Sequence, residues 1–160
     1  MLLWYKLYMQ QRAVNMRETE AKKLAKAMAN ECIAFRVRLL SRVVTNLYNR
    51  ALQPLGVKAN QVTILVLLIS SEKFSPGNVC QALHMEKSTV SRNIERMRAK
   101  GWIEKQRGDG DSSHFLMVTP KGRDLLMEVH AKWQEAQQQA RSLIGAAGVE
   151  RIAELTRRLH

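Results

Sequence analysis

The residues best suited to chemistry lie between Lys87 and Lys100, where hydroxyl and cationic side chains recur at helical spacing. On a helix of about 100° per residue, Val90, Ile94 and Met97 share one face and would anchor the segment to a core. The opposite face carries short hydroxyls near the helix start and arginines further along: Ser88, Thr89, Ser91, Arg92 and Arg96, together with Glu95.

These residue types suit contact with a nucleic acid duplex. Serine and threonine hydroxyls bond base edges or phosphates, and an arginine bonds guanine bidentately or neutralises a phosphate. The start of a helix also favours phosphate oxygens, and Lys87 stands there. A solvated polar face has the same composition, so the neighbouring elements decide between the two interpretations.

The preceding residues predict two further helices. Asn60 is a suitable N-cap for an almost wholly apolar, and therefore central, helix over residues 61–69. Ser75 and Pro76 supply a capping hydroxyl and a proline at the first helical position, which predicts a short second helix. A three-residue turn separates it from the helix that begins at Lys87. Three helices in quick succession, the last two tightly joined, indicate a helix-turn-helix.

After Gly101 the pattern changes from helical to extended. Residues 102–105 and 114–118 are β-rich, and residues 106–113 between them are turn formers. We therefore expect a β-hairpin with a flexible tip.

Long helices are predicted on both sides of this region. From residue 18 to residue 52, apolar side chains form two adjacent rows along the predicted helix. Together these rows make an apolar surface too wide to be covered by a single neighbouring helix. Such a helix is expected to be buried against its own domain and against a partner subunit, and Pro54 ends it. Thr119 and Pro120 begin another helix after the hairpin, and residues 149–160 form a last amphipathic one.

The charge distribution favours a polyanionic partner. The 160 residues have a net charge of +12, with 46% hydrophobic and 25% charged residues, the composition of a folded basic protein. Residues 1–60 hold 11 basic and 3 acidic side chains, and residues 84–107 hold 7 and 3, whereas residues 108–160 are balanced.

Membrane and secreted classes are not expected. The longest apolar run, Ile64–Ile69, is too short to span a bilayer. Two cysteines, Cys32 and Cys80, cannot make a disulfide framework, and the first residues lack the basic start and cleavage site of a signal peptide. We expect a cytoplasmic protein, with no role assigned to the first 15 residues.

The order and spacing of three motifs resemble the MarR family of bacterial winged-helix transcription regulators. The motifs are Ser88–Arg92, Lys100–Glu104 and Thr119–Gly122, and the resemblance runs from about Cys32 to the C-terminus. It implies a mainly α fold with a small β-hairpin wing (α+β), in which a winged helix-turn-helix domain is joined to a helical dimerisation region.

The resemblance also implies a domain division and a mode of action. Residues 1–17 would be an extension of unknown role, 18–56 a dimerisation helix, 57–119 the DNA-binding domain and 120–160 the C-terminal dimerisation helices. A homodimer would place its recognition helices in successive major grooves of a pseudo-palindromic operator and repress transcription until released. In this family, small aromatic acids or other lipophiles often bind between the two regions, here near Phe35, Leu39, Arg42, Val62 and Val66.

The predicted wing departs from the family pattern. Wings of the family usually carry an Asp followed two residues later by an Arg that enters the minor groove, and Gly110 and Ser112 stand at those positions. The tip also contains Asp109 and Asp111, which repel phosphate. We therefore expect wing contacts to come from the hairpin base, from Lys105 and Arg107.

Other chemistries find little support in the residues. Cys32 is a candidate for thiol-based sensing, although the reactive cysteine of the family's hydroperoxide-sensing branch would align with Ala34. The Asp109–Ser112 segment lacks the bidentate glutamate of a calcium loop, and the histidines show no metal-ligand spacing. We expect no metal, no cofactor and no enzymatic activity.

The sequence thus predicts a dimeric, DNA-binding transcription regulator. The expected DNA contacts are Lys87, Ser88, Thr89, Ser91, Arg92, Arg96, Lys105 and Arg107. Two alternatives stay open at this point: a helical dimer that acts as an architectural or protein-interaction module without a specific operator, and a regulator that senses oxidants through its thiols.

Overall fold

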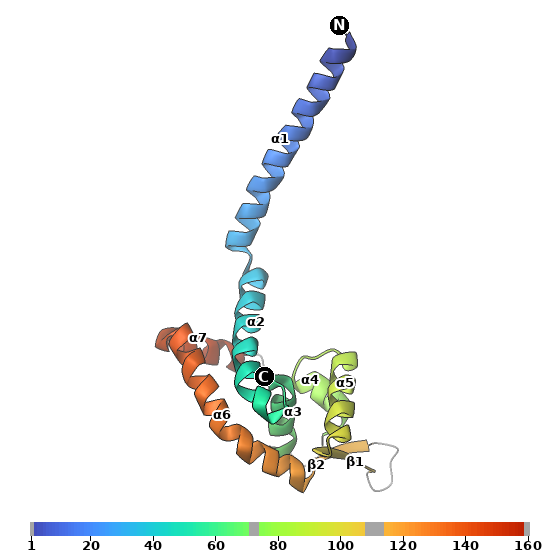
Figure 1. Ribbon diagram of the computed structural model, residues 1–160, viewed down its shortest axis with the longest axis vertical. Coiled ribbons are helices and arrows are strands. Elements are labelled where there is room, and N and C mark those ends of the chain that lie inside the picture. The colour runs from blue at the N-terminus through green and yellow to red at the C-terminus, as the bar shows by residue number, and fades with distance from the viewer. Residues whose placement is uncertain (1, 71–73, 108–113, 159–160) are drawn as a thin grey trace. The chain divides into compact units, whose positions relative to one another are not determined.

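The computed structural model describes residues 2–70, 74–107 and 114–158 and is mainly helical, with one antiparallel hairpin (Figure 1). This confirms the predicted fold class. The chain divides into two compact units, residues 1–43 and 44–160. The elements are α1 (Leu2–Glu31), α2 (Ile33–Leu52), η1 (Gln53–Leu55), α3 (Ala59–Ile69), α4 (Pro76–Ala82), α5 (Lys87–Ala99), β1 (Ile103–Arg107), β2 (His114–Val118), α6 (Pro120–Ile144) and α7 (Ala146–Arg157).

The first unit consists of α1 and the start of α2. The predicted single helix from residue 18 to residue 52 was wrong in two ways, because α1 begins at Leu2 and the helix is interrupted at Cys32. Backbone hydrogen bonds continue across the interruption: the Cys32 amide donates to Met28 at 2.9 Å, and the Arg36 amide donates to Cys32 at 3.2 Å. The residues that sequence analysis left without a role are therefore part of a helix.

The second unit is built around α3. Ile64 and Leu65 are completely buried, which confirms α3 as the central helix. The predicted N-cap Asn60 was wrong, because α3 already begins at Ala59. The Ala59 amide donates to the side chain of Asn49 at 2.9 Å, a residue ten positions earlier that local sequence reading could not connect to it.

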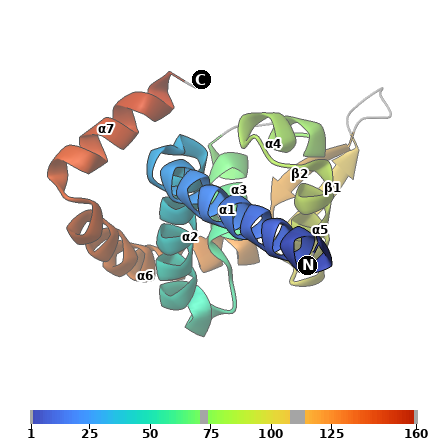
Figure 2. The same cartoon turned by 90° about the horizontal axis from the view of Figure 1, so that it is seen from above.

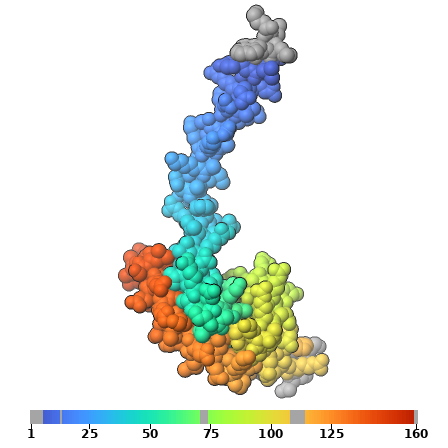
Figure 3. Space-filling view, in the orientation of Figure 1, coloured from blue at the N-terminus to red at the C-terminus, as the bar shows by residue number. Residues whose placement is uncertain are grey.

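The helix-turn-helix forms as predicted from α4 and α5. Ser75 caps α4, with the Asn78 amide donating to the Ser75 hydroxyl at 3.2 Å and Pro76 at the first helical position. His84 turns the chain between the helices with φ of 48°, a left-handed conformation in which histidine is among the more frequent residues. In the space-filling view α4 and α5 form one continuous surface (Figure 3).

The hairpin pairs Ile103 with Val118 and Arg107 with His114 at its two ends. Its base is attached to the unit through Leu116, whose amide donates to the carbonyl of Phe74 at 2.8 Å. Residues 108–113, which join the strands, lie outside the described residues, so the expectations for Gly110 and Ser112 have no structural counterpart here.

Helix α6 begins at a junction with the hairpin. The hydroxyl of Thr119 donates to the carbonyl of Gly101 at 2.6 Å and accepts from the Gly122 amide at 3.1 Å. Helix α7 follows Gly145 and turns back from the end of α6 (Figure 2). It starts at Ala146, three residues before the predicted start. Along the described chain, no single helix is long and apolar enough to cross a membrane, and α2 with η1 meets that test only jointly with α3.

Candidate nucleic-acid interface

Helix α5 is held to the second unit by one apolar face. Val90, Ile94 and Met97 are no more than 2% exposed and belong to the main hydrophobic core. Each buried aliphatic side chain of this size contributes about 1.5–3 kcal/mol relative to an exposed one. The helix therefore has a fixed rotation, and its opposite face points to solvent.

That opposite face carries the polar side chains expected from the sequence. Ser88, Ser91, Arg92 and Arg96 are all exposed, and Thr89 is half-buried. The carbonyl of Thr89 accepts a hydrogen bond from the side chain of Asn93 at 2.9 Å, which orients Asn93 along the helix. The structure thus gathers the predicted hydroxyls and guanidinium groups on one accessible surface.

Lys87 stands at the start of α5, where the backbone is positioned for anions. Glu86 is the N-cap, and its carbonyl accepts from the amides of Thr89 and Val90 at 2.9 and 3.0 Å. The amides of the first helical residues point away from the helix body, which is the arrangement that binds phosphate oxygens. Lys87 is exposed beside them.

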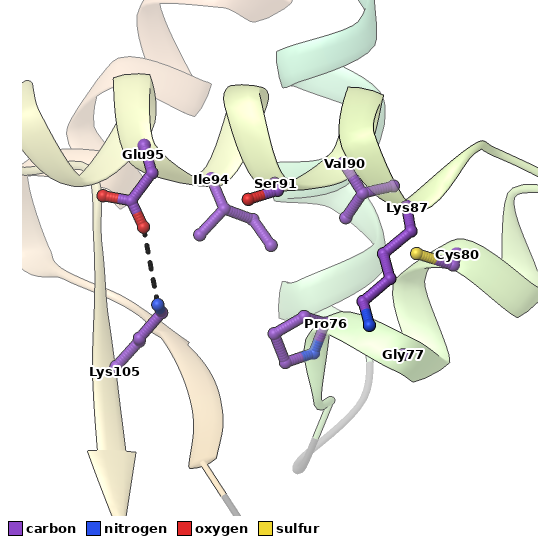
Figure 4. A pocket seen from close by; sticks show the side chains of 9 residues that line it. All are labelled: Pro76, Gly77, Cys80, Lys87, Val90, Ser91, Ile94, Glu95 and Lys105. Atoms are coloured by element: carbon purple, nitrogen blue, oxygen red, sulfur yellow. Dashed lines mark hydrogen bonds and ion pairs between the residues drawn. The ribbon is translucent and has the colours of Figure 1, made fainter.

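The base of the wing lies next to α5 (Figure 4). Lys105 and Arg107 are exposed on β1, as expected. The Lys105 ammonium is 3.4 Å from the Glu95 carboxylate, and the same carboxylate is 3.4 Å from the Arg98 guanidinium. Sequence reasoning put Glu95 on the outward face but missed this link, because residues 95 and 105 belong to different elements.

A pocket of about 340 Å³ lies between α4, α5 and β1 (Figure 4). Val90 and Ile94 form part of its apolar wall, and Lys87 and Lys105 line it with charged side chains. Cys80 is half-buried and lines the same pocket.

A second pocket, of about 370 Å³, lies between α2, α3 and α6 within the second unit. Of the residues predicted to bind an effector, Val62 and Val66 line it. The other three, Phe35, Leu39 and Arg42, belong to the first unit and are exposed.

Sequence reasoning missed two aromatic residues of this second pocket, Tyr48 and Trp133. The Tyr48 hydroxyl donates a hydrogen bond to the side chain of Gln137. Burial raises the pKa of Tyr48, and the nearby Arg141 guanidinium opposes that shift. The phenol is therefore neutral at physiological pH and ties α2 to α6.

The thiol of Cys32 is exposed at the interruption between α1 and α2. Its sulfur accepts a hydrogen bond from the Phe35 amide at 3.4 Å. Within the described ranges, no three His, Cys, Asp or Glu side chains come together as a metal site. The Asp109–Ser112 segment, which the sequence did not favour as a calcium loop, lies outside those ranges.

The fold and the exposed face of α5 define a winged-helix protein of the transcription-regulator class. Three solved or curated proteins illustrate the similarity. The transcriptional regulator MosR of M. tuberculosis is 27% identical, with a TM-score of 0.70 over 82% of this chain and 97% of that one. A MarR variant of E. coli, crystallised in complex with operator DNA, is 20% identical, with a TM-score of 0.72 over 82% of this chain and 97% of that one.

The transcriptional repressor MprA of Escherichia coli is 26% identical over 114 residues, which are 69% of this chain and 65% of that protein. Residues 55–112 match the family model described as MarR family. Over these residues the chain is similar to the MarR family of transcriptional regulators.

Proposed function

We propose that this chain is a homodimeric repressor that binds a pseudo-palindromic operator through α5. The observation that carries the proposal is the division of α5 into two faces, with Val90, Ile94 and Met97 buried and Arg92 and Arg96 exposed. A helix held from behind in this way can enter the major groove, which is wide enough for it.

The exposed residues have distinct expected roles. Ser88, Thr89, Ser91, Arg92 and Arg96 read base edges or hold the backbone, because hydroxyls and guanidinium groups make both kinds of contact. Lys87, Lys105 and Arg107 neutralise phosphates. The relative crystallised with operator DNA supports this use of the fold.

A second copy of the chain is the expected partner of the exposed apolar residues. Helix α2 exposes Ile33, Phe35 and Val37 by more than half of their surface, and α7 exposes Leu155 equally. Exposed apolar surface of this extent is typical of an interaction site. Residues 18–56 and 120–160 would form the dimer, and two recognition helices would reach half-sites roughly 10 bp apart.

Repression and its release are part of the proposal. The similarity to a protein named as a transcriptional repressor supports the sign of regulation. A small aromatic or lipophilic effector would bind in the region of Phe35, Leu39, Arg42, Val62 and Val66 and change the separation of the recognition helices. The pocket lined by Val62 and Val66 supplies a cavity for it. The protein would act in the cytoplasm, where the operator is accessible.

DNA binding is tested by fluorescence anisotropy with two labelled duplexes. One duplex carries the DNA upstream of the protein's own gene, and the other has the same length and a random sequence. Specific binding is typically about 10³-fold or more tighter than non-specific binding. We expect Arg92→Ala and Arg96→Ala each to lower operator affinity by about 1–3 kcal/mol. Equal affinity of the unaltered protein for both duplexes would instead indicate the architectural or protein-interaction module.

Thiol sensing is the second candidate, favoured by the exposure of Cys32. It requires that peroxide lowers operator affinity and that Cys32→Ser abolishes this response. Rapid alkylation of Cys32 by iodoacetamide at neutral pH would support it, because the thiolate is the reactive form. Slow alkylation of both cysteines contradicts it.

A further inference from the structure

Helix α5 contains one acidic side chain, Glu95, on the face that we expect to meet DNA. Phosphate repels a carboxylate there, so its presence opposes the affinity that the neighbouring cations provide. The side chain of Glu95 is 57% exposed and is not neutralised by burial. Glu95 is therefore not expected to bind phosphate, and its function is expected to lie in its contacts with other side chains.

The contacts of Glu95 link two elements that would approach the duplex together. One carboxylate oxygen lies 3.4 Å from the Lys105 ammonium on β1 (Figure 4). Both carboxylate oxygens lie 3.4 Å from the Arg98 guanidinium on α5. Both cations are partly exposed and could otherwise contact phosphates. The carboxylate holds each of them along the protein surface.

The wing backbone at Lys105 is itself firmly placed. Lys105 is paired with Leu116, which is 2% exposed and is bound by its amide to Phe74. The position of the Lys105 ammonium therefore depends on the conformation of the Lys105 side chain. Glu95 forms an ion pair with that ammonium and favours one such conformation.

We propose that Glu95 is a specificity-determining residue that restrains Lys105 and Arg98 from indiscriminate phosphate contact. This inference rests on the proposed function. Binding to random DNA comes from phosphate neutralisation, whereas operator binding also includes contacts to bases. Restraining two cations therefore lowers affinity for random DNA by a larger proportion than affinity for the operator.

The test compares Glu95→Gln with the unaltered protein on the upstream duplex and the random duplex, at several salt concentrations. We expect Glu95→Gln to bind random DNA about two- to fivefold more tightly, the scale of an exposed ion pair. The plot of log affinity against log salt for random DNA should steepen by about 1–2, because up to two further cations contact phosphates. The ratio of operator to random affinity should fall.

Two further variants separate this role from a general effect of charge or structure. Glu95→Asp keeps the carboxylate, so its ratio of operator affinity to random-DNA affinity should be close to that of the unaltered protein. Glu104→Gln makes the same charge change one residue before Lys105, where the side chain of Glu104 accepts from Gln106 and has no contact with Lys105 among the described interactions. It should leave the ratio close to that of the unaltered protein.

The outcomes distinguish this inference from the proposed function. If the unaltered protein does not prefer the upstream duplex, the proposed function fails. If it does, and Glu95→Gln leaves both the ratio and the salt dependence unchanged, only the role of Glu95 is overturned. The role of Glu95 is also overturned if Glu95→Gln binds both duplexes more weakly. It is overturned as well if Glu104→Gln changes the affinity ratio as much as Glu95→Gln does.

Discussion

At the scale of single residues, Gly122 determines how closely α6 approaches the wing. A Cβ atom at this position would lie 2.1 Å from the carbonyl oxygen of Trp102 and 2.8 Å from a methyl group of Val118. The first of these neighbours is backbone and cannot rotate away. The sequence showed a glycine in the Thr119–Gly122 motif, but only the structure shows why a side chain is excluded there.

We expect Gly122→Ala to destabilise the protein by about 1–3 kcal/mol, the usual cost of overpacking a buried site. The measurement is the free energy of unfolding in urea. Gly77→Ala is the matched control, because a Cβ there meets only the Ser75 hydroxyl at 3.6 Å and α4 gains a better helix former. A loss of stability in Gly77→Ala as large as that in Gly122→Ala would show that the close approach is not the cause.

At the scale of elements, the predictions that held were those that depended on neighbouring residues. The caps at Ser75 and Thr119 were predictable because the hydroxyl and the amide it accepts from are three residues apart. The start of α3 was missed because Asn49 caps it from the preceding helix. The contact between Glu95 and Lys105 was missed for the same reason, since it depends on how two elements pack.

Thr119 links the turn between α5 and β1 to the start of α6, so its removal should affect more than a helix cap. We expect Thr119→Ala to lower the free energy of unfolding by about 1–2 kcal/mol, because the Gly122 amide loses its acceptor and the Gly101 carbonyl loses a donor. Thr119→Ser keeps the hydroxyl and should retain most of the stability. Equal losses in the two variants would assign the effect to the methyl group instead, and urea unfolding measures both.

At the scale of the whole molecule, the sequence predicted a basic DNA-binding protein with apolar surface left for a partner. The apolar rows of α2 predicted burial on two sides, and its residues from Ile33 to Val43 are exposed in the single chain. The composition of the pockets could not be predicted, because Tyr48 and Trp133 are brought together only by packing of α2 against α6. Burial of these α2 residues against their own domain is not seen, and in the proposed dimer a partner subunit would have to cover them.

The exposed apolar face of α7 is expected to contribute to the proposed dimer interface. Leu155 is 59% exposed on α7, and in the proposed dimer a charged side chain there would be buried unpaired. We therefore expect Leu155→Glu to convert the dimer to a monomer, measured as mass by light scattering after gel filtration. Arg157→Glu introduces the same residue at an exposed polar position of α7 and should remain dimeric. Each monomer holds a single recognition helix and half of the phosphate contacts. Leu155→Glu should therefore bind both duplexes more weakly, with the larger loss on the two half-sites and a shallower salt dependence on random DNA. A dimeric Leu155→Glu protein with full operator affinity would exclude this face of α7 from the interface.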